Sequence, residues 1–320
     1  MRKSRVGTAG MALALLLAAC GGGSGGGAMQ EDAGPAATDP AFVADNQAWR
    51  AERRVRLLEA DGWASLVGLH WIELPAHYVG SGATNGIRLA KGPEKLGLLQ
   101  QQGGKVWLTP ETDASLTVDG EAAADRFELQ SDLSPTPTLV GFDEGRGQLS
   151  LVERGGRRAL RVKHADADTL TRLGPLDYWP ADPAWRVRAR FVAHPAGKTI
   201  PIMDITSQQA PQPNPGVVEF QHGGGTYRLE ALEGEDGGLF LVFADRTSGH
   251  ESYGAGRYLY TAAPAADGSV TVDFNRAYNP PCVFTDFATC PLPPPENRLD
   301  LAITAGEKKY ARPQAAAPAR

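Results

Sequence analysis

Residues 186–191 read RVRARF, a strict alternation of arginine with valine, alanine and phenylalanine. Successive side chains of a strand point to opposite faces, so the pattern predicts arginines in water and apolar side chains in a core. Nine further short runs are expected to be strands, at residues 106–109, 115–118, 148–152, 159–162, 216–221, 226–232, 239–243, 257–260 and 270–274. Turn residues separate them, in a chain with 38 Gly and 24 Pro, so we expect a mainly β protein, a sandwich or barrel architecture in two parts.

Two turn signals indicate antiparallel pairing. The dipeptide DG at residues 119–120 closes the run 115–118, and DG is a preferred hairpin turn. The tetrapeptide RGGR at residues 154–157 stands between the runs 148–152 and 159–162. We therefore expect a hairpin there as well.

One helix is expected at the start of the folded body. Asp39 can cap it, Pro40 can take the first helical position, and residues 42–60 contain neither Gly nor Pro. Gly62 is expected to end the helix.

The chain begins with Arg2, Lys3 and Arg5, continues with the apolar run MALALLL at residues 11–17, and has small residues before Cys20. This order is typical of a secretory signal. The apolar run is too short to span a membrane, which takes about 20 apolar residues.

Residues 17–20, LAAC, resemble the lipobox of bacterial lipoproteins. In that family the cysteine takes a diacylglycerol before cleavage. We therefore expect residues 1–19 to be a lipoprotein signal peptide and acylated Cys20 to hold the protein to a lipid bilayer, on the periplasmic side of the cell envelope. Gly21 is not the aspartate associated with inner-membrane retention, which favours the outer membrane.

The remaining boundaries follow from composition. Residues 20–39 are rich in glycine and are expected to be a flexible tether. Residues 40–165 are expected to hold the helix and one β-sandwich, and residues 185–312 a second, antiparallel β domain with a polar loop. Acidic residues and prolines interrupt the strand pattern at 165–185. Residues 313–320 are expected to be a disordered tail.

Charge and histidine spacing exclude several classes of function. The chain carries 32 Lys and Arg against 37 Asp and Glu, and signal cleavage would remove three of the basic residues. Phosphate-backbone binding needs concentrated positive charge, so nucleic acid is not expected as a partner. The six histidines show no metal-ligand spacing, and neither a metal nor a cofactor is expected.

The N-terminal half shows a pattern of short segments: residues 68–71 (GLHW), 78–81 (YVGS), 85–89 (NGIRL), 105–108 (KVWL) and 118–120 (VDG). This pattern resembles the strand spacing of forkhead-associated (FHA) β-sandwich domains, which read phosphothreonine through an arginine and a serine. Ser81 is present, but no arginine stands where the family's phosphate-binding one would. The resemblance therefore implies an FHA-like β-sandwich and not phosphopeptide binding.

The C-terminal half carries four dense motifs: residues 243–257 (FADRTSGHESYGAGR), 273–282 (DFNRAYNPPC), 289–299 (TCPLPPPENRL) and 305–310 (AGEKKY). These motifs resemble the domain-of-unknown-function family 1684 (DUF1684) of bacterial and archaeal proteins. The resemblance runs from about residue 49 to residue 310. It implies a family but no reaction.

The polar residues of these motifs are the candidate binding or catalytic site. Arg276 offers a planar guanidinium suited to a carboxylate or phosphate, and we expect Arg257 to share its site. The candidate residues are Asp245, Glu251, Tyr253, Arg257, Asp273, Asn275, Arg276 and Asn279.

Three readings of this set stay open. It could form a rigid pocket for a small anionic or sugar-like ligand, in an envelope binding or structural module. Its groups could instead bind one another and pin a long loop onto the sheet. It could also form a hydrolase-like site between residues 245–257 and 273–279, with Asp245, Glu251 or Asp273 as acid or base.

Cys282 and Cys290 are the only cysteines besides Cys20. They enclose a short Pro-flanked loop, and an exported protein meets an oxidising compartment. A metal site would need two more ligands, and a catalytic thiol would need a base beside it. We therefore expect a structural disulfide.

The lipobox generates a first prediction. Replacing the acceptor thiol in Cys20→Ser should prevent acylation, so the protein should no longer pellet with membranes after alkaline washing. Immunoblotting of the membrane and supernatant fractions measures this. Retention of the variant in washed membranes would contradict lipid anchoring at Cys20.

Overall fold

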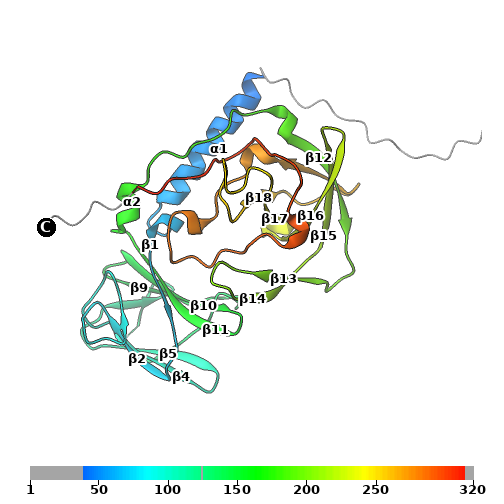
Figure 1. Ribbon diagram of the computed structural model, residues 1–320. Coiled ribbons are helices and arrows are strands. Elements are labelled where there is room, and N and C mark those ends of the chain that lie inside the picture. Colours follow the sequence, from blue (N-terminus) through cyan, green and yellow to red (C-terminus); the bar gives the residue numbers. More distant parts are fainter. Residues whose placement is uncertain (1–38, 124, 314–320) are drawn as a thin grey trace, which may run out of the picture. The chain divides into compact units, whose positions relative to one another are not determined.

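The computed structural model of the protein describes residues 39–123 and 125–313 (Figure 1). The described residues belong to one compact unit. The expected fold class is confirmed: the chain is mainly β, with antiparallel sheets and one long N-terminal helix. The predicted signal peptide and lipidation site lie outside the described residues, as do the tether up to residue 38 and the tail from residue 314.

The N-terminal half is a sandwich of two sheets around one core. The first sheet has the order β1-β11-β10-β9-β6-β7 and the second the order β3-β2-β4-β5-β8. Buried residues of both sheets, such as Val79, Leu108, Val140 and Leu160, form a single cluster. The strands are β1 (Leu66–Trp71), β2 (Ala76–Gly80), β3 (Ile87–Arg88), β4 (Gly97–Gln102), β5 (Lys105–Pro110), β6 (Leu116–Val118), β7 (Glu121–Ala123), β8 (Phe127–Leu129), β9 (Leu139–Phe142), β10 (Gly147–Arg154) and β11 (Arg157–His164).

Both expected hairpins are present. Gly155 and Gly156 have φ of 55° and 76° and join β10 to β11, with Arg154 paired to Arg157. Positive φ at both central residues is the requirement of a type I′ turn, and glycine meets it without steric strain. Asp119 also has a positive φ, in the turn from β6 to β7.

The C-terminal half is built on a sheet with the order β18-β17-β16-β15-β12-β19 and a two-stranded sheet, β13-β14. The RVRARF alternation is confirmed in part: Val187 and Ala189 are buried and Arg188 and Arg190 exposed, but Phe191 is half-buried. The strands are β12 (Arg186–Ala193), β13 (Thr199–Met203), β14 (Gln209–Pro213), β15 (Gly216–His222), β16 (Gly225–Glu233), β17 (Leu239–Phe243), β18 (Arg257–Thr261) and β19 (Ser269–Asp273).

The core of this half is completed by chain that forms no strand. After β19 the segment 274–305 contributes Phe274, Ala277, Leu299 and Ile303 to the same buried cluster as the sheet. Its polar motifs therefore lie on a segment that has no strand ladder to hold its backbone in place.

The helix α1 (Pro40–Leu58, blue in Figure 1) begins where the sequence predicts. The Asp39 side chain accepts a hydrogen bond from the Ala41 amide at 2.9 Å, which caps the first turn. A Cβ on Gly62 would lie 2.5 Å from the Arg56 carbonyl oxygen, so only glycine fits where the chain leaves the helix. A short second helix, α2 (Asp168–Arg172), was not expected.

The helix α1 docks through a buried ion pair. Arg53 donates from Nε to Glu307 Oε1 at 3.1 Å and from Nη2 to the Asn279 carbonyl at 3.0 Å, and Glu307 is fully buried. Other polar side chains of α1 bind residues 173–179, 186 and 276. The helix thus packs on the C-terminal half, whereas the sequence grouped it with the sandwich at 40–165; the domain boundaries themselves stay a prediction.

This pair generates a stability prediction. Glu307→Gln should lower the free energy of unfolding by about 3 kcal/mol or more, because it leaves the Arg53 guanidinium buried without its counter-charge. Urea unfolding followed by circular dichroism measures the change. The control is Asp300→Asn, which breaks the exposed Arg246–Asp300 pair and should leave the transition nearly unchanged. Equal losses in both variants would contradict a special role for the buried pair.

Candidate functional site

Asp245 and Arg257 form a buried ion pair. Arg257, at the start of β18, is 1% exposed and donates from Nη2 to Asp245 Oδ2 at 2.7 Å. The same guanidinium donates to the Ile303 and Ala305 carbonyls, and Asp245 accepts from the Thr247 and Ile303 amides. Burial lowers the pKa of Arg257, and the Asp245 carboxylate opposes that shift. The pair pins the segment at 303–305 onto the sheet.

A second network is built on Asp273, the last residue of β19. Its Oδ1 accepts from the Asn275 amide at 3.1 Å and from Asn275 Nδ2 at 2.9 Å, and its Oδ2 accepts from Arg186 Nε at 2.7 Å. Asn275, which is fully buried, also exchanges two hydrogen bonds with the backbone of Asp182. Arg276 is half-exposed and binds Asp45 of α1 at 2.7 Å. These contacts fix the turn that follows the strand.

The third network surrounds Glu307. Its Oε2 accepts from the Asn279 amide at 2.8 Å, and Asn279 Nδ2 donates to the Lys308 carbonyl. The Tyr178 hydroxyl lies 3.3 Å from Glu307 Oε1, and burial together with that charge raises the pKa of Tyr178. Asn279 therefore belongs with the docked helix and not with Asp273.

The remaining candidates lie elsewhere. Glu251 is exposed, and its carbonyl accepts from the Lys309 amide. The Tyr253 hydroxyl lies 3.8 Å from Cys282 Sγ. Arg257 and Arg276 bind different carboxylates, and none of the eight candidate residues lines either cavity described below. The geometry favours the reading in which most of these groups bind one another.

The expected disulfide is absent from the structure. Cys282 and Cys290 are both free and buried, with the Cys282 amide donating to Cys290 Sγ at 3.1 Å. The short spacing in the sequence correctly predicts that the two residues lie in contact. Bond formation, however, needs an oxidant as well as proximity, and the fold accommodates both sulfurs as thiols.

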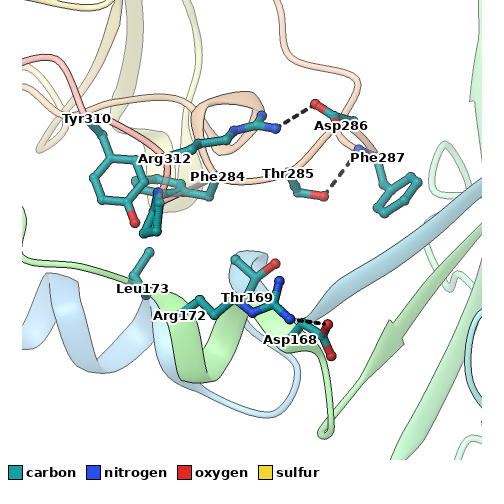
Figure 2. A pocket seen from close by; sticks show the side chains of 11 residues that line it. Asp168, Thr169, Arg172, Leu173, Phe284, Thr285, Asp286, Phe287, Tyr310 and Arg312 are labelled. Atoms are coloured by element: carbon teal, nitrogen blue, oxygen red, sulfur yellow. Dashed lines mark hydrogen bonds and ion pairs between the residues drawn. The ribbon is translucent and has the colours of Figure 1, made fainter. Parts of the chain in front are cut away.

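Two cavities adjoin at Leu173. The first, about 200 Å³, lies between α2 and residues 284–287 and 310–313 (Figure 2). Phe284 and Tyr310 form its apolar side, with ring centroids 5.1 Å apart. Both of its arginines are neutralised: Arg172 binds Asp168 at 3.0 Å and Arg312 binds Asp286 at 2.7 Å. The lining of this cavity therefore has little net charge with which to bind an ion.

The second cavity, about 410 Å³, lies between α1 and residues 173–178. Its lining includes Arg50, Arg54 and Tyr178 and no acidic residue. Both arginines bind only carbonyl oxygens: Arg50 donates to the Trp179 carbonyl at 2.9 Å, and Arg54 to the Gly174 carbonyl at 2.8 Å. No described carboxylate lies within ion-pair distance of either one.

Arg50 is held in place on the wall of this second cavity. Its guanidinium carbon lies 4.5 Å from the centre of the Tyr178 ring, a cation–π distance. Burial lowers the pKa of Arg50, and its buried Nε has no hydrogen-bond partner in the described structure. The arrangement places a fixed positive charge, with no described carboxylate beside it, on the wall of the cavity. Sequence reasoning missed this site, although four arginines within residues 50–56 were a visible signal.

Comparisons with known proteins bear on the C-terminal half most strongly. The family described as "Protein of unknown function (DUF1684)" matches residues 171–308, a shorter span than the expected 49–310. An uncharacterised protein of Haloarcula marismortui, solved by NMR in solution, is 34% identical, with 42% of this chain and 77% of that chain covered and a TM-score of 0.36. No curated protein matches the sequence.

A solved FHA domain also matches, in the N-terminal part. It is the N-terminal FHA domain of EssC, a component of the bacterial type VII secretion apparatus. Identity is 14%, coverage is 30% of this chain and 45% of that chain, and the TM-score is 0.24. The sandwich assignment rests on the sheet order and the shared core given above, and not on this likeness. The match over residues 171–308 identifies this part of the chain as a member of the DUF1684 family.

Proposed function

We propose that the protein is a lipid-anchored component of the bacterial cell envelope that binds a small anionic ligand in the cavity between α1 and residues 173–178. The envelope location rests on the signal-like N-terminus and the LAAC motif at residues 17–20. No helix in the described part of the chain is long and apolar enough to cross a membrane. An acylated Cys20 would supply the attachment to the bilayer.

One observation carries the binding proposal: Arg50 and Arg54 line a cavity of about 410 Å³ without a carboxylate partner. Arginine guanidinium groups bind carboxylates and phosphates through paired N–H donors. A cavity of this size can enclose a sugar-sized molecule. The Tyr178 ring and Pro175 supply apolar surface for the body of such a ligand.

The hydrolase alternative lacks comparable support. Asp245 and Asp273 are buried and form ion pairs with arginines, whereas Glu251 is exposed. A general acid or base must reach the substrate. The contacts of Asp245 and Asp273 therefore support a structural role for these two residues.

Calorimetric titration tests the binding proposal. The full chain carrying Cys20→Ser should bind glucuronate or inorganic phosphate and should not bind glucose, which lacks the charge. Arg50→Ala should weaken the binding of the anion at least about tenfold, because a hydrogen bond to a charged group contributes about 1.5–3 kcal/mol. Arg54→Ala should act in the same direction.

The matched control is Arg56→Ala, on the same helix. Arg56 is exposed and pairs with Glu52 at 3.8 Å, so its removal should leave anion binding unchanged. Glucose binding as strong as glucuronate binding would contradict the proposal. An Arg56→Ala loss equal to that of Arg50→Ala would mean that the titration reports general surface charge.

A further inference from the structure

Cys282 and Cys290 lie in a chemically asymmetric environment. Both belong to the buried cluster that includes Tyr258 and Val242, with exposures of 8% for Cys282 and 3% for Cys290. The Cys282 amide points at Cys290 Sγ, and the Tyr253 hydroxyl faces Cys282 Sγ at 3.8 Å. Each thiol has a tyrosine hydroxyl beside it, Tyr253 for Cys282 and Tyr258 for Cys290, but the Tyr258 hydroxyl already donates to the Pro291 carbonyl at 2.8 Å. Cys282 is also the more exposed of the two thiols.

Positive charge lies at both ends of the loop that joins the cysteines. Arg312 donates to the Cys282 carbonyl at 2.6 Å, and Arg154 and Arg161 both donate to Thr289 Oγ1, at 3.0 Å and 2.9 Å. Cationic side chains next to a thiol favour its thiolate form. Arg312 and Arg154 are also ion-paired, with Asp286 and Asp132 at 2.7 Å each, so Arg161, next to Thr289, is the arginine of these three without a carboxylate partner among the described residues.

Arg161 makes no ion pair with a described residue, and burial lowers its pKa to about 10. The pKa of Cys282 lies below its usual value, since the Cys290 thiol donates to it and Tyr253 and Arg312 add to the effect. Burial and the neighbouring sulfur raise the pKa of Cys290.

We infer that Cys282 and Cys290 are a reversible redox pair, with Cys282 as the attacking thiol and Cys290 as the resolving thiol. The co-reactant is a small-molecule or protein disulfide, as an oxidising compartment would supply. The inference is independent of the proposed anion cavity but rests on the proposed envelope location, which supplies the oxidant. It also differs from a structural disulfide, which would be closed permanently and would need no activated thiol.

The reaction proceeds in two exchange steps. The Cys282 thiolate attacks one sulfur of the external disulfide, forms a mixed disulfide and expels one thiolate. That thiolate takes up the proton that Cys290 loses, and Cys290 then attacks Cys282 Sγ and releases the second thiolate, which is protonated from water. The dithiol loses two electrons and two protons, and the external disulfide gains them as two thiols.

Intact-mass spectrometry tests the pair on the full chain carrying Cys20→Ser, so that only two thiols remain. Oxidised glutathione should remove the mass of two hydrogen atoms without a persistent adduct, and dithiothreitol should restore it. With Cys290→Ser added, a glutathione adduct should accumulate on Cys282. With Cys282→Ser added, an adduct on Cys290 should form at least about tenfold more slowly.

Circular dichroism of each serine variant checks its fold. Should a variant unfold, limited alkylation of the chain with both cysteines, followed by peptide mapping, gives the same comparison and should label Cys282 first. Equal reactivity of the two cysteines would overturn the inference. So would two thiols that persist in the folded protein but oxidise in urea, or a folded disulfide that dithiothreitol cannot reduce.

Discussion

The buried carboxylate of Glu307 is the constraint on which the C-terminal half depends. It accepts hydrogen bonds from Arg53 on α1, from the Asn279 amide and from the Tyr178 hydroxyl, so segments far apart in the sequence meet at one charged group. A fully buried carboxylate is stable only when its oxygens accept hydrogen bonds and a nearby cation balances its charge. Undocking of α1 would therefore remove Arg53 and leave the Glu307 carboxylate without its counter-charge.

The polar motifs of the family serve the same purpose along the rest of the chain. The segment after β19 has no strand partner for most of its length, yet its backbone polar groups still need bonds. Side chains provide several of them: Asp273 accepts from the Asn275 amide, Glu307 accepts from the Asn279 amide, and Arg257 donates to the carbonyls at 303 and 305. A dense polar motif is thus what a long irregular covering segment requires, and it need not signal catalysis.

The sequence predicts the regular elements well and the site poorly. Alternation, the RGGR turn and the Asp39–Pro40 cap depend on local structure; the structure confirms the turn and the cap, and the alternation in part. Strands β13 and β14 were missed because their prolines remove backbone donors and read as breakers. Whether a charged side chain ends beside a partner depends on tertiary packing. The pattern could not show that Arg257 is buried while Arg54 borders a cavity.

In an acidic protein, the buried arginines that lack a carboxylate partner are the ones that call for an explanation. The chain has a formal net charge of −5, so carboxylates are plentiful, and most arginines of the described structure lie against one. Arg50, Arg54 and Arg161 do not, although each is at least partly buried. A buried cation is stabilised by a nearby negative charge. An anionic ligand can supply that charge to Arg50 and Arg54, and this missing counter-charge is the physical argument for the proposed anion cavity.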